Sequence, residues 1–413
     1  MSSRGPSRRR AHIAMIGVPM ISHVLPGLEI IRELAARGHR VTYADDPAVA
    51  HLIEPTGAEL VPYDSTLPHR DNIWPDDPIE ASALFLDDAM AVLPQLRAVY
   101  DDDPADLYLY DIGAYVGRAL AEAQGRPVVQ LSPTFVAWGS YQEDVGAHLA
   151  RLPGADVLEA RFKEWLAGCG ATTLDVGEFS GVPPRALATI PRAMQPHADT
   201  VGPRVDFVGP CFGDRARRGG WARPEGAEKV LLVSLGSAYT KRPEFYRRCV
   251  AAFGDLPGWH VVLQIGKHVD PAELGADLPA NIEVRSWVPQ LAILEQADAF
   301  VTHAGMGSSG EGLYTGVPMI AVPQGAEQPM NADRLVELGV ARRLDTEDAT
   351  GDALRSALLA LVSDPEVAER CARLKEEVRA AGGTSRAADL IEAELWRASS
   401  GSSRTVDGSR SHT

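Results

Sequence analysis

The feature of this chain that most constrains its fold is a regular alternation of short apolar runs with longer amphipathic segments. In the first half, the runs "HIAMIGV" and "HRVTYA" flank the helical pattern "LPGLEIIRELAARG". The alternation restarts in the second half with "KVLLVSLGS" and "WHVVLQIG". Apolar strands that alternate with helices form parallel sheets covered on both faces. We therefore expect an α/β protein built from two doubly wound domains that face each other.

The length of the chain agrees with this division, because 413 residues exceed one ordinary hydrophobic core. The segment "GDRARRGGWARPEG", residues 213–226, is rich in Gly, Arg and Pro and has no periodicity, which indicates an interdomain linker. We expect one domain over 11–212 and a second, with the C-terminal helices, over 227–397. The basic arm 1–10 and the Gly/Ser-rich tail 398–413 are expected to be disordered.

Composition excludes several classes of function. The net charge of −16, from 40 basic and 56 acidic residues, disfavours binding to nucleic acid. The four cysteines are scattered without a C-x-x-C pair, which fits a reducing cytoplasm rather than a disulfide framework or a zinc site. The apolar run after "SRRR" is too short for an export signal and is needed as a strand. No run is long enough for a transmembrane helix, so we expect a cytoplasmic protein without a membrane partner.

A glycine-rich segment, "HAGMGSSGEG", follows the predicted strand "AFVT" in the second half. Ligands of open parallel sheets bind beyond the carboxyl ends of the strands. We expect Gly305 and Gly307 to let the backbone turn tightly, and Ser308 and Ser309 to cap the next helix. Free N–H groups at that helix N-terminus suit a diphosphate, to which His303 can donate a further hydrogen bond.

Other residues near this loop suit the remainder of a nucleotide. Glu311, one turn into the helix, can accept hydrogen bonds from both hydroxyls of a ribose. Upstream, the indole of Trp287 offers a flat surface for a base, and Gln290 lies nearby in sequence. The alternative is structural: turn-forming glycines, a strand-end histidine and a core tryptophan. Each residue alone favours that alternative, because Gly-rich turns between strands and helices are common.

The nucleotide-binding interpretation is favoured over the structural one by the complete run "WVPQLAILEQADAFVTHAGMGSSGEGLYTGVPMIAVPQGAEQPMNA". It resembles the nucleotide-sugar signature of UDP-glycosyltransferases in the order and spacing of its parts: W-x-P-Q, H-x-G, the serine loop, E-G, G-V-P and E-Q. The similarity extends from His12 to about Trp396, and it is strongest to the macrolide glycosyltransferases of actinomycetes. The resemblance implies the GT-B fold, in which two Rossmann-like domains face each other across a cleft.

The resemblance also implies roles for individual residues. A UDP-sugar would be held mainly by the second domain, with uracil against Trp287 and Gln290 and the ribose on Glu311. The diphosphate would be surrounded by Ser237, His303, Ser308 and Ser309. Glu327 and Gln328 would contact the sugar hydroxyls, although close macrolide relatives usually have Asp in the first of these positions. UDP-sugar is then a co-substrate, and no cofactor or metal is expected.

His23 lies where the first strand passes into a helix. This junction is at the carboxyl edge of the sheet, where ligands bind. Glycosyl transfer with inversion requires a base for the acceptor hydroxyl, and a neutral imidazole serves near pH 7. The helix N-terminus disfavours the imidazolium before reaction. Asp111 ends the strand "DLYLYD" at the same edge. The resembled family pairs a His with such an Asp, so we assign the catalytic base to His23 and its orienting partner to Asp111.

Two features of the first half, a departure from the family sequence and an insertion, bear on which acceptor the protein binds. Macrolide relatives often read H-G-H-V-N-P where this chain reads "ISHVLP", so Ile21 makes the acceptor side more apolar. The irregular, mainly helical insertion 135–185 should form much of the acceptor pocket, with Trp138 and Tyr141 as candidate contacts. The "DDDPAD" segment contains a D-x-D, but it lies at a predicted helix end away from the donor motif. We interpret it as a solvated turn.

These inferences favour an inverting O-glycosyltransferase that transfers a sugar, with glucose the first candidate, from a UDP-sugar to a hydrophobic natural product such as a macrolide antibiotic. Self-resistance and biosynthetic tailoring would use the same chemistry. One alternative is a biosynthetic enzyme that uses a dTDP-deoxysugar. A sugar-nucleotide epimerase and a catalytically silent sugar-nucleotide binder are disfavoured, the first by the donor signature and the second by the retention of His23 and Asp111.

Overall fold

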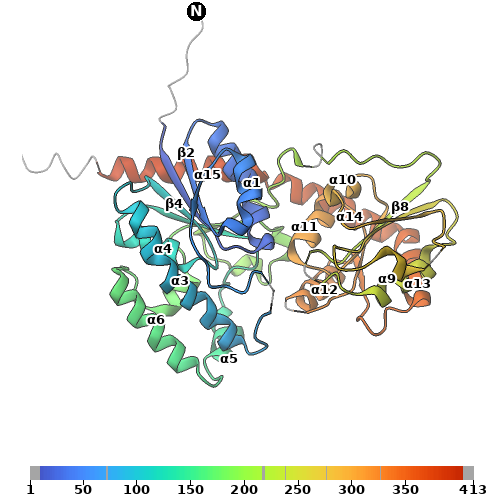
Figure 1. The fold of residues 1–413 in the computed structure, drawn as a ribbon, viewed down its shortest axis with the longest axis horizontal. Helices are drawn as coiled ribbons and strands as arrows, with labels where there is room; N and C mark the ends of the chain where they lie inside the picture. The colour runs from blue at the N-terminus through green and yellow to red at the C-terminus, as the bar shows by residue number, and fades with distance from the viewer. Residues whose placement is uncertain are drawn as a thin grey trace, which may run out of the picture. The chain divides into compact units, whose positions relative to one another are not determined.

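The computed structural model describes residues 10–70, 73–215, 219–237, 239–275, 277–325 and 327–402 (Figure 1). The chain divides into two compact units. The first comprises Met1–Thr189, Pro196–Cys211 and Gly382–Thr413, and the second comprises Ile190–Gln195 and Phe212–Ala381. Each unit is a parallel sheet with helices, which confirms the expected α/β class and its two Rossmann-like domains.

The sheet of the first unit has the strand order β3-β2-β1-β4-β5-β6-β7, and all of its neighbouring strands are parallel. Its strands are β1 (His12–Ile16), β2 (Arg40–Asp45), β3 (Glu59–Pro62), β4 (Leu107–Asp111), β5 (Val128–Ser132), β6 (Ala186–Ala188) and β7 (Val205–Phe207). Its helices are α1 (Ile21–Ala36), α2 (Ala50–Ile53), α3 (Pro78–Tyr100), α4 (Tyr115–Ala123), α5 (Ala147–Leu149), α6 (Ala155–Cys169), α7 (Val176–Gly181) and α15 (Gly383–Ser402).

The two faces of this sheet build two separate cores. Along β1, Ile13 and Met15 belong to one buried cluster, whereas Ala14 and Ile16 belong to the other. Successive strand side chains point to opposite faces, so a strand with helices on both sides must be apolar throughout. This requirement explains the unbroken apolar runs in the sequence.

The second unit repeats the architecture with the strand order β10-β9-β8-β11-β12-β13, again entirely parallel. Its strands are β8 (Lys229–Ser234), β9 (Trp259–Gln264), β10 (Ile282–Arg285), β11 (Ala299–Thr302), β12 (Met319–Ala321) and β13 (Ala341–Arg343). Its helices are α9 (Pro243–Phe253), α10 (Gln290–Leu294), α11 (Met306–Thr315), α12 (Gln328–Glu337), α13 (Gly351–Ser363) and α14 (Pro365–Ala380).

The C-terminal helix α15 differs from the expected domain division. The sequence analysis assigned it to the domain 227–397, but it packs against α1 in the first unit (Figure 1). Its buried residues join the core cluster that contains β1 and α1, and they are Ala387, Ala388, Leu390, Ile391 and Leu395. Arg37, at the end of α1, donates to Glu392 at 2.8 Å. The predicted linker 213–226 likewise begins within the second unit, because that unit starts at Phe212.

The chain ends also differ in part from the expectation. The helix α15 continues to Ser402, five residues into the segment expected to be disordered. The remaining part of that tail, from residue 403, and most of the N-terminal arm, residues 1–9, lie outside the described residues.

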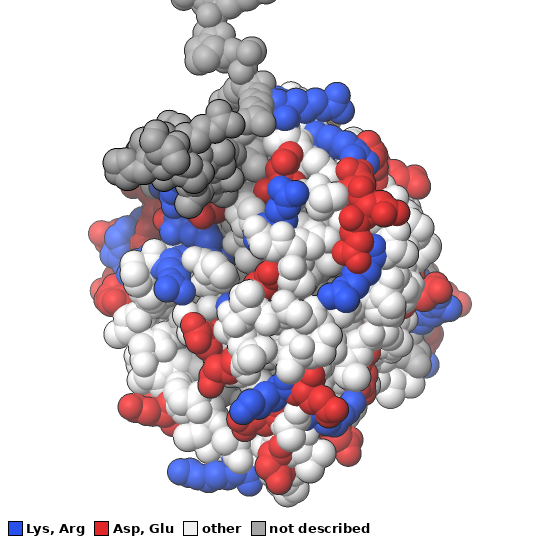
Figure 2. All heavy atoms as spheres, turned by 90° about the vertical axis from the view of Figure 1, so that its left-hand side faces the viewer, with Lys and Arg blue, Asp and Glu red and all other residues white. Residues whose placement is uncertain are grey.

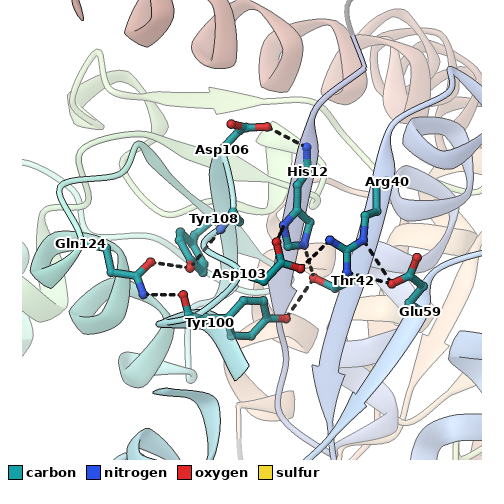
Figure 3. A network of polar contacts seen from close by, with 10 residues as sticks. His12, Arg40, Thr42, Glu59, Tyr100, Asp103, Asp106, Tyr108 and Gln124 are labelled. Atoms are coloured by element: carbon teal, nitrogen blue, oxygen red, sulfur yellow. Dashed lines mark hydrogen bonds and ion pairs between the residues drawn. The ribbon is translucent and has the colours of Figure 1, made fainter. Parts of the chain in front are cut away.

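The two aspartates of the D-x-D segment, just after α3, have structural partners, and Figure 3 shows the contacts of Asp103. Asp103 pairs with Arg40 of β2, and this hydrogen bond lowers the pKa of the Asp103 carboxyl. Asp101 accepts a hydrogen bond from Gln124 Nε2 at 3.0 Å. Within the described ranges, no group of three or more His, Cys, Asp or Glu side chains is placed to hold a metal ion.

The surface charge is mixed rather than segregated. On the face shown in Figure 2, Lys and Arg side chains are interspersed with Asp and Glu side chains and form no large patch of one sign. A protein that binds nucleic acid through the phosphate backbone needs a basic patch, which this face lacks. No helix in the described part of the chain is both long and apolar enough to cross a membrane.

A buried carboxyl group at the end of β2 was not expected from the sequence. Asp45 is fully buried, and its Oδ2 has no hydrogen-bond partner among the described residues. A Cβ on the neighbouring Gly17 would lie only 2.4 Å from that oxygen, so glycine leaves the space that the carboxyl group fills. Burial, with the nearby charge of Asp111, raises the pKa of Asp45 well above its usual range.

Asp45→Asn should therefore stabilise the first unit at neutral pH. Because the pKa is raised in the folded state, the unfolded chain releases the proton first, and stability falls as the pH rises from the unfolded pKa of about 4 toward the folded value. The gain from the amide should be larger at about pH 8 than at about pH 5, because each pH unit between the unfolded and the folded pKa costs the carboxylate about 1.4 kcal/mol. Thermal unfolding at both pH values tests this, with the exposed Asp64→Asn as the control. A loss of stability at neutral pH would mean that Asp45 is a favourable, ionised group.

Candidate active site

The predicted pair His23 and Asp111 is brought together at the carboxyl edge of the first sheet. Asp111 is the last residue of β4, and His23 lies in the first turn of α1, which follows the neighbouring strand β1. His23 Nδ1 lies 2.9 Å from Asp111 Oδ1 and 3.0 Å from Oδ2. The helix begins at Ile21, earlier than the pattern from Leu25 onward indicated, so His23 is already helical.

The surroundings of this pair determine which ring nitrogen carries the proton. Asp111 is buried, and its Oδ1 also accepts a hydrogen bond from the Gly113 backbone at 2.8 Å. An ionised carboxylate only accepts, so Nδ1 of a neutral His23 is the protonated nitrogen. Nε2 is then the nitrogen that can take up a proton. The side chain of His23 is 20% exposed, which leaves the ring accessible from one side.

In the second unit, the glycine-rich loop leads from β11 into α11 as expected, but its turn differs in detail. The residue with a positive φ, 60°, is Ala304 rather than Gly305 or Gly307. The Asn331 side chain donates to the Ala304 carbonyl at 3.0 Å and so supports this conformation. Gly305 instead lets the His303 ring lie close to the backbone, since a Cβ on Gly305 would lie 2.4 Å from His303 Nε2. A Cβ on Gly307 would meet nothing within 4 Å, so the first turn of α11 is open on that side.

The expected capping by the two serines is wrong. The N-cap of α11 is Gly305, without a side-chain cap, because the helix already begins at Met306. Ser309 is fully buried, and its Oγ has no hydrogen-bond partner among the described residues. Ser308 is 8% exposed. No side chain caps the backbone N–H groups at the start of α11, and their use as donors for an anion stays a prediction.

His303 lies between this loop and the end of β8. Burial lowers its pKa to about 4, so the imidazole is neutral at physiological pH. Its Nδ1 is buried and makes no hydrogen bond among the described residues. A hydrogen bond with the Ser234 backbone acts against this lowering. A neutral imidazole has one N–H to donate, so His303 can serve an anion only by exchanging a hydrogen bond and not as a positive charge.

Gln290 and Glu311 form the best-defined polar contact of the second unit. Gln290 Nε2 lies 2.7 Å from Glu311 Oε2 and 3.1 Å from Ser308 Oγ. Glu311 is 5% exposed, and it also forms an ion pair with Arg215. Arg215 belongs to the segment that the sequence analysis assigned to the linker, and nothing in its spacing indicated this contact.

Trp287 lies on the surface, which rules out the core position that was its structural alternative. Its side chain is 72% exposed and borders a hollow of about 250 Å³. The other residues lining the hollow are Gly219, Gly220, Trp221, Glu283, Arg285, Val288 and Pro289. Trp221 was missed, although an aromatic residue inside a Gly/Arg-rich segment was a signal that could have drawn attention to it.

The remaining donor candidates differ in exposure. Ser237 and Glu327 are exposed, whereas Gln328 is buried. Gln328 Oε1 accepts from the Gln324 backbone at 2.8 Å, so the oxygen of this amide is engaged and its NH₂ group is the part left for donating. The structure therefore places Glu327 at the surface where α12 begins, and Gln328 inside that end of the helix.

On the acceptor side, the candidates differ in their surroundings. Ile21 is 45% exposed at the start of α1. Trp138 and Tyr141 contact each other edge to face with ring centroids 4.9 Å apart, and the Trp138 indole donates to Asp144 at 2.7 Å. The insertion 135–185 is helical and irregular as expected. However, Phe162, Trp165 and Phe179 are buried in the core of the first unit, whereas Phe135 is half-buried.

Comparison with known proteins agrees with this arrangement. Residues 216–377 match the family model described as UDP-glucoronosyl and UDP-glucosyl transferase. The chain is 56% identical over 393 residues to the oleandomycin glycosyltransferase of Streptomyces antibioticus, covering 93% of this chain and 91% of that protein. It is 34% identical to the NDP-glycosyltransferase YjiC of Bacillus subtilis (strain 168), over 93% of this chain and 97% of that protein.

Solved structures give the same result. The glycotransferase of kitacinnamycin has a TM-score of 0.86 at 53% identity and covers 94% of this chain and 99% of its own. The calicheamicin glycosyltransferase CalG4 has a TM-score of 0.84 at 33% identity, with the same coverage of both chains. Both are glycosyltransferases by name. The chain therefore belongs to the UDP-glucoronosyl and UDP-glucosyl transferase family, is a glycosyltransferase and has the GT-B fold.

Proposed function

We propose that this glycosyltransferase transfers a sugar, glucose in the first instance, from a UDP-sugar to a hydroxyl of a hydrophobic natural product, with inversion at the anomeric carbon. The observation that carries the proposal is the His23–Asp111 hydrogen bond, because it provides an oriented base at the ligand-binding edge of the first sheet. A macrolide is the acceptor class to test first, since the relative at 56% identity is named for oleandomycin.

The proposed chemistry uses one proton transfer and one displacement. His23 Nε2 takes the proton of the acceptor hydroxyl while that oxygen attacks the anomeric carbon from the face opposite the diphosphate. The bond between the sugar and UDP breaks, and the electron pair leaves with the diphosphate. Asp111 holds Nδ1–H and stabilises the imidazolium that forms, so it orients the base without exchanging a proton itself.

The donor half of the proposal is supported by the second unit. The open N-terminus of α11 and the neutral His303 provide hydrogen-bond donors for the leaving diphosphate, so we assign no metal ion to the reaction. Trp287 offers an exposed indole face for the uracil, and Glu311 offers a buried carboxylate for the ribose. A ribose supplies two adjacent hydroxyl donors to Glu311, whereas the deoxyribose of a dTDP-sugar supplies one, which favours UDP.

The principal alternative is a dTDP-deoxysugar donor, as in a biosynthetic tailoring enzyme. A relative named demethyllactenocin mycarosyltransferase, from Streptomyces fradiae, is 32% identical over 409 residues, so this donor class belongs in the same experiment. The epimerase alternative is not retained, because the chain is a glycosyltransferase.

A donor and acceptor screen tests the function directly. The purified protein is incubated with UDP-glucose, UDP-galactose, dTDP-glucose and a dTDP-deoxysugar against a panel of macrolides and flavonoids, and the products are detected by mass spectrometry. We expect a hexose added to a macrolide from UDP-glucose, with full turnover in excess chelator. Product from dTDP-sugars alone would establish the alternative donor class. Activity that requires added magnesium or manganese would contradict the metal-free assignment.

The catalytic pair is tested by single-turnover kinetics at saturating donor. His23→Ala should lower the rate by about 10²- to 10⁴-fold, the usual contribution of a general base. Asp111→Asn should also lower it, because an amide does not stabilise the imidazolium. The double variant should be little slower than His23→Ala alone, since Asp111 then has nothing to orient.

The control for the catalytic pair is His51→Ala, which removes an exposed histidine of the same unit. It should leave the rate unchanged. Independent, multiplying losses in the double variant would show that His23 and Asp111 do not act as a unit. A wild-type rate for His23→Ala would exclude His23 as the base.

The ribose assignment is tested by calorimetric titration with UDP. Glu311→Ala should weaken binding by about 10- to 150-fold, because the ribose hydroxyls lose an ionised hydrogen-bond acceptor. Glu295→Ala is the matched control, since Glu295 is a carboxylate of the same unit that pairs with Arg379. Equal affinities of the folded Glu311→Ala variant and the control would remove Glu311 from the donor site.

A further inference from the structure

The carboxylate assigned to the ribose already has a charged partner in this structure. Both oxygens of Glu311 are engaged: Oε2 accepts from Gln290 Nε2 at 2.7 Å, and Oε1 pairs with the guanidinium of Arg215. The carboxylate is 6% exposed, whereas the Arg215 side chain is 32% exposed. A ribose that binds Glu311 through two hydroxyls needs the oxygen that Arg215 occupies.

Arg215 is held over Glu311 by aromatic contacts of its own segment. The Arg215 guanidinium lies 5.0 Å from the centroid of the Phe212 ring. Phe212 in turn packs edge to face on Tyr314 with ring centroids 5.0 Å apart. Tyr314 follows Glu311 by three residues on α11, so both side chains lie on one face of that helix. The segment from Phe212 to Arg215 therefore runs along this face and contacts it at two points.

The physical reason for the ion pair is the burial of Glu311. An ionised carboxylate with little access to water is costly unless a charge and hydrogen bonds compensate it. Gln290 supplies one hydrogen bond, and Arg215 supplies the opposite charge. A ribose replaces the contact to Oε1 with neutral hydroxyl donors, so nucleotide binding exchanges an ion pair for hydrogen bonds.

We propose that Arg215 is a positioning residue of the donor site, which occupies the ribose-binding oxygen of Glu311 and must release it before a nucleotide is seated. The proposal rests on the proposed function, because that function assigns the ribose to Glu311. The ion pair of the free protein is lost on binding and subtracts from donor affinity. Arg215 thus keeps the buried carboxylate compensated in the absence of donor, and the cost is weaker nucleotide binding.

Calorimetric titration of Arg215→Ala with UDP and with uridine tests this exchange. We expect both ligands to bind about 5- to 30-fold more tightly than to the wild type, because the competitor for Oε1 is gone. Uridine carries the ribose but no phosphate, so an equal gain for both ligands locates the competition at the ribose. Damage to the fold cannot produce a gain in affinity. Arg215→Gln, which keeps the length of the side chain without its charge, should behave in the same way.

Arg379→Ala is the matched control. Arg379 lies over the Tyr314 ring at 4.5 Å but pairs with Glu295 instead of Glu311, so its removal should change UDP affinity by less than about twofold. The dependence on the carboxylate is tested in the Glu311→Ala background. There, removal of Arg215 should have no effect on the affinity for either ligand.

The outcomes separate this inference from the proposed function. A wild-type protein that binds no UDP would overturn the function and the inference together. Wild-type binding that is unchanged in Arg215→Ala would overturn the inference alone. Weaker UDP binding with unchanged uridine binding in Arg215→Ala would also overturn it, because the guanidinium would then be a ligand of the diphosphate.

Discussion

Both functional regions depend on the parallel, in-register pairing of strands. In a parallel sheet, every strand ends at the same edge, so residues far apart in sequence meet there without any local signal. Ile16 of β1 pairs with Ala44 of β2 and Tyr110 of β4, which brings Asp45 and Asp111 to the level of Gly17. The same rule places the loop that precedes α11 at the end of the second sheet. A slip by one residue would turn each of these side chains to the opposite face.

Three buried carboxyl groups at these edges are compensated in three different ways. Asp111 receives hydrogen bonds from His23 and from the Gly113 backbone, and it is poised to stabilise a positive charge. Glu311 is compensated by the guanidinium of Arg215 and the amide of Gln290. Asp45 accepts one hydrogen bond from the Asp46 backbone, but its Oδ2 has no partner among the described residues, and the raised pKa favours the protonated carboxyl.

The fold and the contact between His23 and Asp111 could be predicted because they depend on periodicity and on residue types at strand ends. His23, Asp111 and the carboxylate on α11 follow from the sheet rules together with the family signature. The helix cap and the turn were less predictable, since the exact start of α11 decides whether Ser308 is a cap or an interior residue. The contact of Arg215 could not be predicted, because a segment without periodicity gives no indication of what it packs against. Trp221 offered only its aromatic side chain as a signal. The partner of α15 could not be predicted for a different reason: the apolar stripe of a helix does not specify which sheet the helix covers.

The return of α15 to the first unit has a consequence for synthesis of the chain. The core of the first unit includes Ile391 and Leu395, which are made after the whole of the second unit. Domains generally fold as units during synthesis, in order from the N-terminus. Here that order is reversed at the last step: the second unit has all of its residues by Ala381, while the first waits for the end of the chain. Until then the face of α1 that α15 covers is exposed on the ribosome, and its apolar surface is one that a chaperone would recognise.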